Sequence, residues 1–298
     1  MAIVGLKKSK KKSDLWIALA FAGPALLGLL VFILIPGGRG IFLSFTEYNI
    51  FRAPEFTGLE NYIRMFNDPV FWNALGVTLQ YVIVNITFQT ILALFLAVLL
   101  HRFTRSAIVR GIVLTPYLIS NVIIALVWYW LLDYNLGLVN SVIEALGLDK
   151  ITFFSEALAM SSIAMINVWR HLGYTALLIF AGLQAIPKDV YDAAAVDGAG
   201  EWRTFRSVTL PLLRPVMAFV LVITVTGSFQ IFDTIAVTTK GGPINSTRTF
   251  SILISDTAWS NNEFGYAAAI SVALMVMLSV IAFAQTKLLS ANQSDMDR

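Results

Sequence analysis

The chain has 298 residues, of which 57% are apolar and 13% are charged. Soluble domains carry roughly a quarter charged residues, so this composition excludes an ordinary soluble protein. The net charge is only +3, which gives no indication of a nucleic-acid partner. The sequence has no cysteine, and its two histidines lack the spacing of a helical zinc motif, which excludes disulfides and the common zinc sites.

Six apolar stretches are long enough to cross a bilayer, because a span needs roughly 20 predominantly apolar residues. Four of them contain no charged residue: 15–36, 79–100, 111–132 and 265–286. Two more have polar interruptions, at Arg170 and His171 within 157–183 and at Asp233 within 216–239. The sequence therefore predicts an all-α, polytopic membrane protein with six transmembrane helices.

The predicted domain organisation is one membrane domain, residues 15–288, between a basic N-terminus of residues 1–14 and a tail of residues 289–298. The first apolar run follows a cluster of lysines, as in a secretory signal peptide. It is longer than the roughly 7–15 apolar residues of such a peptide, so we expect a retained helix.

The distribution of basic residues predicts the orientation in the membrane. Six helices place both termini on one side, and 14 of the 21 Lys and Arg residues then lie in segments on that side, against six in the outer segments. An excess of basic residues marks the cytoplasmic side. We therefore expect both termini in the cytoplasm, with the lysine cluster at 7–12 as an orientation anchor.

The outer segments carry turn and helix signals. The triplet 67–69, Asn-Asp-Pro, predicts a turn or a helix start with proline in its first turn, and Trp72 is expected at the lipid interface. Apolar spacing within 133–156 predicts a short helix that ends at Gly147. The triplet 241–243, Gly-Gly-Pro, predicts a turn.

The longest polar-rich interval in the second half of the chain is DVYDAAAVDGAGEWRTFRSVTLPLLRP, residues 189–215. Proline suits a first helical turn, so a short helix is expected over 187–196. Asp197 and Gly198 then predict a break, because glycine accepts positive φ without steric cost. A second helix is expected over 200–208, stopped by Pro211.

Three alanines at 193–195 give the first of these helices a surface of small side chains. Such a surface allows close approach of another backbone and suits a helix that inserts into a groove of a partner protein. It equally suits a helix that lies against its own bundle, and the alanine composition alone does not separate the two.

The spacing of this interval resembles the "EAA" loop of permease subunits in binding-protein-dependent ABC importers, whose pattern is EAA, three residues, G, nine residues, I-x-LP. The matching residues are Asp192-Ala193-Ala194, then Gly198, then Val208-x-Leu210-Pro211. Asp192 replaces the usual glutamate and Val208 the usual isoleucine. The stretches GLENYIRMFNDPVFWNALGVT, FDTIAVTTKGGPINSTRTFSI and FGYAAAISV are similar to the subfamily that imports sugars and related compounds such as glycerol phosphate.

The resemblance implies the ABC importer permease fold in a prokaryotic cell membrane, with a coupling helix within loop 184–215 seated in a cleft of the cytoplasmic ATPase. The residues it assigns to coupling are Tyr191, Asp192, Ala193, Ala194, Asp197, Gly198, Ala199, Leu210 and Pro211. It also implies four kinds of contact: a second homologous permease, two ATPase subunits, an extracytoplasmic solute-binding protein and the lipid bilayer.

No GxxxxGK[ST] phosphate-binding loop occurs in the sequence. We therefore expect a transport subunit that is not itself an enzyme and binds no cofactor, with ATP and Mg²⁺ held by the partner ATPases.

Ionisable residues within spans face a bundle interior or a wet cavity, because a charge at mid-helix costs about 2.5–3.5 kcal/mol on insertion scales. Arg170 and Asp233 are the candidates here. From the outer ends of their helices, Arg170 lies roughly 20 Å and Asp233 about 9 Å along the axis, so a direct pair is expected only if a helix is broken.

The residues predicted to contact solute are Asn167, Trp169, Arg170, Phe229, Gln230 and Asp233. The group around Arg170 fits two roles, hydrogen bonding to a hydroxylated or anionic solute and locking of neighbouring helices. His171, Asn85, Gln89 and Asn121 are assigned to packing between helices. Gly227 and Ser228 predict a bend in the fifth span.

Two other classes of protein were weighed. A self-sufficient secondary transporter or channel would place essential ionisable groups along its own pathway. A membrane enzyme would need paired acids, a nucleophile with a base, or a metal cluster, and the polar residues of the spans provide none of these.

Overall fold

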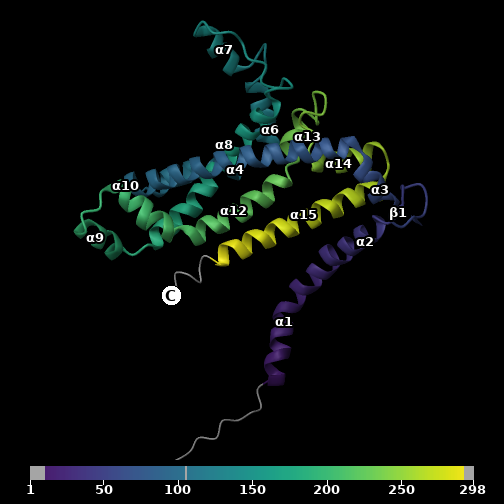
Figure 1. Ribbon diagram of the computed structural model, residues 1–298, viewed down its shortest axis with the longest axis horizontal. Helices are drawn as coiled ribbons and strands as arrows, with labels where there is room; N and C mark the ends of the chain where they lie inside the picture. Colours follow the sequence, from purple (N-terminus) through teal and green to yellow (C-terminus); the bar gives the residue numbers. More distant parts are fainter. Residues whose placement is uncertain (1–10, 105, 292–298) are drawn as a thin grey trace, which may run out of the picture. The chain divides into compact units, whose positions relative to one another are not determined.

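The computed structural model describes residues 11–104 and 106–291. The chain divides into two compact units, residues up to 65 with 257–272, and residues 66–256 with those from 273 onward. Figure 1 labels most of the helices and the strand β1. Residues 7–10 of the basic cluster, and most of the predicted tail, lie outside the described residues.

The first unit contains a long helix followed by a small hairpin. The helix runs without interruption through α1 (Lys11–Leu29), the π-helical segment η1 (Leu30–Leu34) and α2 (Ile35–Leu43). Strands β1 (Thr46–Glu47) and β2 (Glu55–Phe56) pair antiparallel, with Thr46 opposite Phe56. This two-residue pair is the one departure from the all-α prediction among the described residues.

Helix α3 (Glu60–Asn67) begins in the first unit and is tied to the chain around β1. The side-chain amide of Asn61 donates to the carbonyls of Ser44 (3.0 Å) and Thr46 (2.9 Å), and Ser44 bonds the hydroxyl of Tyr62 at 2.7 Å. The π-helical segment η3 (Asp256–Ser260) and the start of α15 (Phe264–Ala291) complete the chain order of this part.

The second unit is built on α4 (Pro69–Phe103), which starts as the sequence predicts. Asp68 is the N-cap, its carboxylate accepts from the Val70 N–H at 2.8 Å, and Pro69 is the first helical residue. The helix packs extensively against α8 (Ala159–Ala185), which also contacts α5 (Ala107–Leu118), and the blue and teal ribbons of α4 and α8 lie side by side in Figure 1.

Small side chains allow this close packing of α4 on α8. Ala93, Ala97 and Ala176 are fully buried, and their cluster includes Ile179 of α8 and Leu213 at the start of α12 (Arg214–Phe229). In membrane helices small residues allow backbones to approach closely, and packing then stabilises the pair. This cluster joins α4, α8 and the start of α12.

The remaining elements of the second unit are short. They are α6 (Asn121–Leu131), α7 (Leu138–Ala145), α9 (Lys188–Val196), α10 (Glu201–Thr204), the π-helical segment η2 (Phe205–Thr209), α11 (Leu210–Leu212), α13 (Asp233–Val237) and α14 (Phe250–Ser255). The turn predicted at 241–243 is present, and the Gly242 N–H donates to the Thr239 carbonyl at 2.9 Å.

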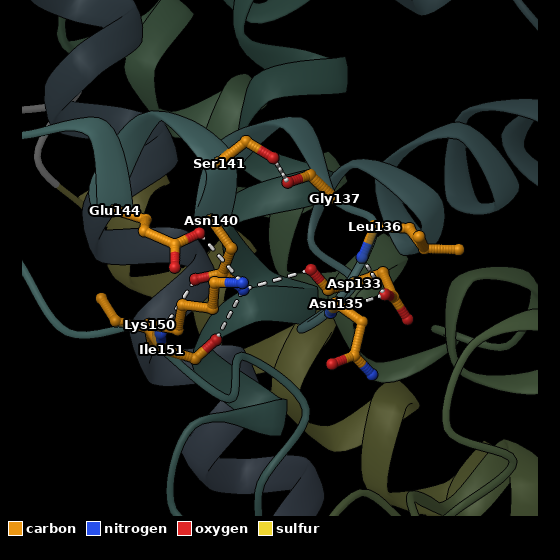
Figure 2. Close-up of polar contacts among 9 residues, drawn as sticks. All are labelled: Asp133, Asn135, Leu136, Gly137, Asn140, Ser141, Glu144, Lys150 and Ile151. Atoms are coloured by element: carbon orange, nitrogen blue, oxygen red, sulfur yellow. Dashed lines mark hydrogen bonds and ion pairs between the residues drawn. The ribbon is translucent and has the colours of Figure 1, made fainter.

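Helix α7 and its flanking loops form the outer segment shown in Figure 2. The Asp133 carboxylate accepts from the N–H groups of Asn135 and Leu136, both at 2.8 Å, and these bonds lower the pKa of Asp133. Buried Asn140 donates to the carbonyls of Asp133 and Ile151 and accepts from the Ile151 N–H. The predicted short helix is confirmed.

Five helices of the described chain are long and apolar enough to cross a membrane: Leu19–Leu43, Pro69–Phe103, Ala159–Ala185, Arg214–Val237 and Phe264–Lys287. The remaining predicted span, at 111–132, is a bent pair of helices and not one continuous helix. It consists of α5 and α6, which meet at an angle of 88°. Proline lacks the N–H of a regular helical bond, and Pro116 lies in the last turn of α5, just before the break.

Two further boundaries differ from the prediction. Pro211 does not stop the second inner helix, because η2 precedes it and the chain stays helical into α12. In η2 the Leu210 N–H bonds the Phe205 carbonyl five residues back, and the wider turn accommodates the proline ring. The break in the fifth span lies at 230–232, just beyond the expected bend at Gly227 and Ser228.

Candidate functional site

A cavity of about 400 Å³ lies within the second unit, between α4, α8, α12 and the two helix breaks. Its wall combines aromatic and polar side chains. The aromatic and charged lining residues are Tyr81, Tyr117, Arg170, His171, Tyr174, Phe232 and Asp233. The uncharged polar ones are Asn85, Gln89, Asn121, Asn167, Thr175, Thr224, Ser228 and Gln230.

Four of the six residues predicted to contact solute line this cavity: Asn167, Arg170, Gln230 and Asp233. The other two lie elsewhere. Trp169 is 41% exposed and packs edge-on against Trp128, with ring centroids 5.5 Å apart. Phe229 is buried in the unit at 2% exposure and is not part of the cavity wall.

Arg170 is held at the break between α5 and α6. Its Nη2 donates to the carbonyl oxygens of Tyr117 (3.3 Å) and Ile119 (3.4 Å), and its guanidinium carbon lies 5.2 Å from the centroid of the Tyr117 ring. The last carbonyls of a helix have no intrahelical partner. Arg170 therefore caps the C-terminal end of α5 and stabilises the bend.

His171 supports this arrangement. Its Nδ1 lies 2.9 Å from the Asn167 carbonyl oxygen, and its Nε2 lies 2.9 Å from Arg170 Nη1. A carbonyl only accepts and a guanidinium only donates, so Nδ1 carries the proton and Nε2 accepts. The imidazole is then neutral and orients the guanidinium.

Asp233 is the first residue of α13, directly after the second helix break, and it is hydrogen-bonded to a residue at the first break. Asn121, the first residue of α6, donates from Nδ2 to Asp233 Oδ2 at 3.1 Å, and the Thr234 hydroxyl lies 3.5 Å from Asn121 Oδ1. Among the described residues Arg170 and Asp233 form no ion pair within 4.0 Å. Both breaks thus contribute to one cavity, with the two charges held by separate partners.

A chain of uncharged side chains crosses from α4 to α8 and α12. Asn85 donates to Gln89 (3.1 Å) and Ser228 (2.9 Å), and Gln89 donates to Thr175 (2.9 Å). The assignment of Asn85 and Gln89 to packing is supported by these bonds, but both also line the cavity. Tyr81, Asn85 and Gln89 are spaced four residues apart, which places them on one helical face. This spacing is the sequence signal that could have predicted a polar cavity wall on α4.

Helices α5 and α8 touch along a glycine. A Cβ atom at Gly173 would overlap the carbonyl oxygen of Val113 and lie 2.7 Å from its carbonyl carbon. One turn further along α5, Tyr117 stacks on Tyr174 with centroids 4.4 Å apart and planes 11° apart. This close contact positions Tyr117 and the end of α5 beside Arg170.

The inner loop has the predicted first helix and break. Helix α9 ends at Val196, and Gly198 follows with φ +69°. The Ala199 N–H bonds the Ala194 carbonyl and the Gly198 N–H bonds the Ala195 carbonyl, which is the Schellman arrangement at a helix end. A residue with a positive φ is required there, and glycine supplies it.

The two faces of α9 differ in exposure. Ala194 is 8% exposed, and the Tyr191 hydroxyl accepts from the Thr209 hydroxyl at 3.3 Å, so this face lies against the chain. The opposite face carries exposed Asp192 and Ala193. The three alanines therefore do not form one surface: Ala194 is buried against the chain, and Ala193 is exposed.

The second inner helix is held to the end of α4 by an ion pair. Arg102 donates from both terminal nitrogens to the Glu201 carboxylate, at 2.9 and 2.7 Å, and this pairing lowers the pKa of Glu201. The other residues assigned to coupling lie at two places. Asp197 and Ala199 flank Gly198 at the break after α9, and Leu210 and Pro211 lie in α11, just before the fifth span.

Comparison with known proteins places these features in a family. The model of the "Binding-protein-dependent transport system inner membrane component" family matches residues 89–292. The probable ABC transporter permease protein YurN of Bacillus subtilis is 32% identical, over 92% of this chain and 96% of its own length. The trehalose/maltose transport system permease protein MalF of Thermococcus litoralis is 34% identical, over 86% of this chain and 87% of its own.

A solved structure shares the fold. It is a bacterial ABC transporter involved in the import of the acidic polysaccharide alginate, and the matching chain has a TM-score of 0.82 at 23% identity. The match covers 95% of this chain and 98% of the other. The likeness extends over both compact units of the present chain.

Proposed function

Because the chain belongs to the family of binding-protein-dependent transport system inner membrane components, we propose that it forms half of the translocation pathway of an ATP-driven importer for a sugar or related solute. The observation that carries the proposal is the cavity, in which tyrosine rings and uncharged hydrogen-bonding groups gather inside otherwise apolar helices. Concave cavities in which polar groups converge beside aromatic rings are the usual places for small-molecule sites.

The composition of the wall supports a hydroxylated solute. Amide and hydroxyl groups both donate and accept hydrogen bonds, which matches the hydroxyls of a sugar. A trehalose/maltose permease among the relatives is consistent with this class. Arg170 adds one cationic position, so the wall also accommodates a solute with an anionic group.

The inner loop supports coupling to a separate ATPase. The exposed face of α9 carries Asp192 and Ala193, and its small side chains suit a groove in a partner. The residues proposed to contribute are Tyr191, Asp192, Ala193, Ala194, Asp197, Gly198, Ala199, Leu210 and Pro211. Tyr191 and Ala194 lie on the face of α9 that packs against the rest of the chain, and Gly198 ends the helix.

The proposed assembly contains this chain, a second homologous permease, two ATPase subunits that bind ATP and Mg²⁺, and an extracytoplasmic binding protein. The family description names dependence on a binding protein. The excess of basic residues on the inner segments supports a topology with both termini in the cytoplasm. In this assembly the ATPase subunits hydrolyse ATP, and this chain converts their motion into opening and closing of the pathway.

Purification from native membranes and reconstitution test the proposal. An affinity-tagged chain should retain an ATP-hydrolysing subunit and a second permease, and sugar uptake in proteoliposomes should need both ATP and the binding protein. A self-sufficient secondary transporter or channel would instead carry solute as the isolated chain in liposomes. Transport by the isolated chain would refute the proposed role.

A further inference from the structure

Asn85 holds an unused hydrogen-bond acceptor in the cavity wall. It lies in α4, is 3% exposed and lines the cavity. Its Nδ2 donates to Gln89 Oε1 at 3.1 Å and to Ser228 Oγ at 2.9 Å. Within the described chain its Oδ1 is buried and has no hydrogen-bond partner. An unpaired buried acceptor is costly and is therefore uncommon in folded proteins.

The orientation of this amide follows from its neighbours. The Ser228 hydroxyl donates its one proton to the Thr224 carbonyl at 2.6 Å, so Ser228 can only accept from Asn85. Gln89 donates from Nε2 to Thr175, which turns its own oxygen toward Asn85. A flipped Asn85 would point its oxygen at two acceptors. Both donors of Asn85 are thus committed, and Oδ1 is left without a partner in the part of the chain that the structure describes.

We propose that Asn85 Oδ1 accepts a hydrogen bond from a hydroxyl of the transported solute and is a specificity-determining residue of the pathway. The inference rests on the proposed function, because it assigns the solute class to the same cavity. A hydroxyl supplies the donor that Oδ1 lacks. A carboxylate or phosphate dianion has no proton to donate, so an anionic group does not satisfy this position.

The position of Asn85 also orients the solute. Thr175, which belongs to the Asn85 hydrogen-bond chain, lies five residues beyond Arg170 on α8, and five residues correspond to about 7.5 Å along a helix. A neutral hydroxylated part of the solute therefore lies toward Asn85. An anionic group, in a solute that has one, lies toward Arg170.

Replacement of single solute hydroxyls by fluorine tests the hydrogen bond, because fluorine removes the donor and keeps the approximate size. Uptake of trehalose, maltose and sn-glycerol 3-phosphate would be measured in cells with the complete transporter. Monodeoxyfluoro derivatives of the transported compound would then compete with it. In the unaltered protein, one derivative should compete about tenfold more weakly than the others, the ratio expected for one unsatisfied buried acceptor.

The variant Asn85→Leu removes the acceptor and should abolish that difference between derivatives, whatever its effect on total uptake. Thr90→Val is the matched control, since Thr90 also carries a buried side-chain oxygen on α4 without a partner among the described residues but is not among the residues that line the cavity, and it should keep the difference. Membrane levels and thermal stability of both variants identify a folding defect. If Asn85→Leu does not fold, Asn85→Ala provides the same comparison with a smaller side chain that also lacks an acceptor.

The outcomes separate the two hypotheses. Uptake with the same ranking of derivatives in the unaltered protein and the Asn85 variants would overturn the role of Asn85 alone. Equal competition by all derivatives in the unaltered protein would also overturn it. Uptake of none of the three compounds, nor of other mono- and disaccharides offered in their place, by the unaltered transporter would contradict both the solute class and this inference.

Discussion

Gly173→Ala should separate α5 from α8 and destabilise the cavity. The new Cβ would overlap the Val113 carbonyl oxygen and lie 2.7 Å from the carbonyl carbon, where carbon atoms normally stay about 3.5–4.0 Å apart. A backbone carbonyl in a helix cannot rotate away, so α5 itself must move by about 1 Å. The bonds from Arg170 to the Tyr117 and Ile119 carbonyls, already 3.3 and 3.4 Å long, would then break.

The expected cost combines these effects. Overpacking in a closely packed interior costs about 1–3 kcal/mol, and loss of a hydrogen bond to a charged group costs about 1.5–3 kcal/mol. Alanine recovers roughly 1 kcal/mol of helix propensity relative to glycine. A net destabilisation of a few kcal/mol remains, and at roughly 2–4 °C per kcal/mol the melting temperature should fall by about 5 °C or more.

Gly182→Ala is the matched control on the same helix. Its Cβ would meet side-chain atoms only, of Val216 (2.8 and 3.1 Å) and Leu213 (3.1 Å), and these yield more easily than a backbone carbonyl. Thermal unfolding of both purified variants in the same detergent, followed by size-exclusion chromatography, measures the difference. A Gly173→Ala protein as stable as the Gly182→Ala protein would refute the reasoning from backbone contact.

Three other predictions concern single side chains. Gly198→Val places a β-branched residue at φ +69°, a conformation that costs L-residues about 1–2 kcal/mol. The variant should still insert in the membrane but should no longer retain the ATPase on affinity purification. Normal retention would argue against the role of the loop. Arg170→Lys keeps the charge but not the planar fork, and should lower the maximal uptake rate; an unchanged rate would show that the cap on α5 is dispensable. In Arg102→Gln, the pKa of Glu201 should rise toward its ordinary value. Because the pKa of Glu201 is lowered in the native protein, the ion pair stabilises the fold at pH values above the ordinary carboxyl pKa, and this stabilisation is lost as the pH falls through the lowered pKa. A carboxyl titration by NMR that is the same in both proteins would contradict this.

Local signals in the sequence predict several element boundaries. Asp68 and Pro69 begin α4 because an N-cap carboxylate and an N1 proline act within their own turn. Gly198 ends α9 for an equally local reason, its positive φ. The helix and the break at 187–198 could therefore be predicted without knowledge of the rest of the fold, whereas the coupling role comes from the family resemblance alone.

The break between α5 and α6 could not be predicted in the same way, whereas the break in the fifth span lies close to the bend expected at Gly227 and Ser228. Residues 111–132 read as one apolar run, and apolarity sets length but not direction. The bend depends on contacts made across the fold, from Arg170 to the end of α5 and from Asn121 to Asp233. These partners are 51 or more residues apart in sequence, so no local pattern indicates them.

The phase of α8 explains which of its predicted residues reach the cavity. Asn167, His171 and Tyr174 follow the i, i+4, i+7 spacing of one helical face, and all three line the wall. Trp169 lies two residues after Asn167, on another face, and packs on Trp128. Helical spacing from Asn167 was thus a better guide than chemical suitability for sugar stacking.

The central claim is that the exposed face of α9 contacts an ATP-hydrolysing subunit, and site-specific cross-linking tests it directly. The chain has no cysteine, so a single cysteine at Ala193 would be the only thiol on this subunit, with one at Leu146 in the outer segment as the control. In native membranes the account predicts a cross-link from position 193 to the ATPase and none from position 146. Failure of position 193 to reach any nucleotide-hydrolysing subunit in the intact, transport-competent assembly would contradict it.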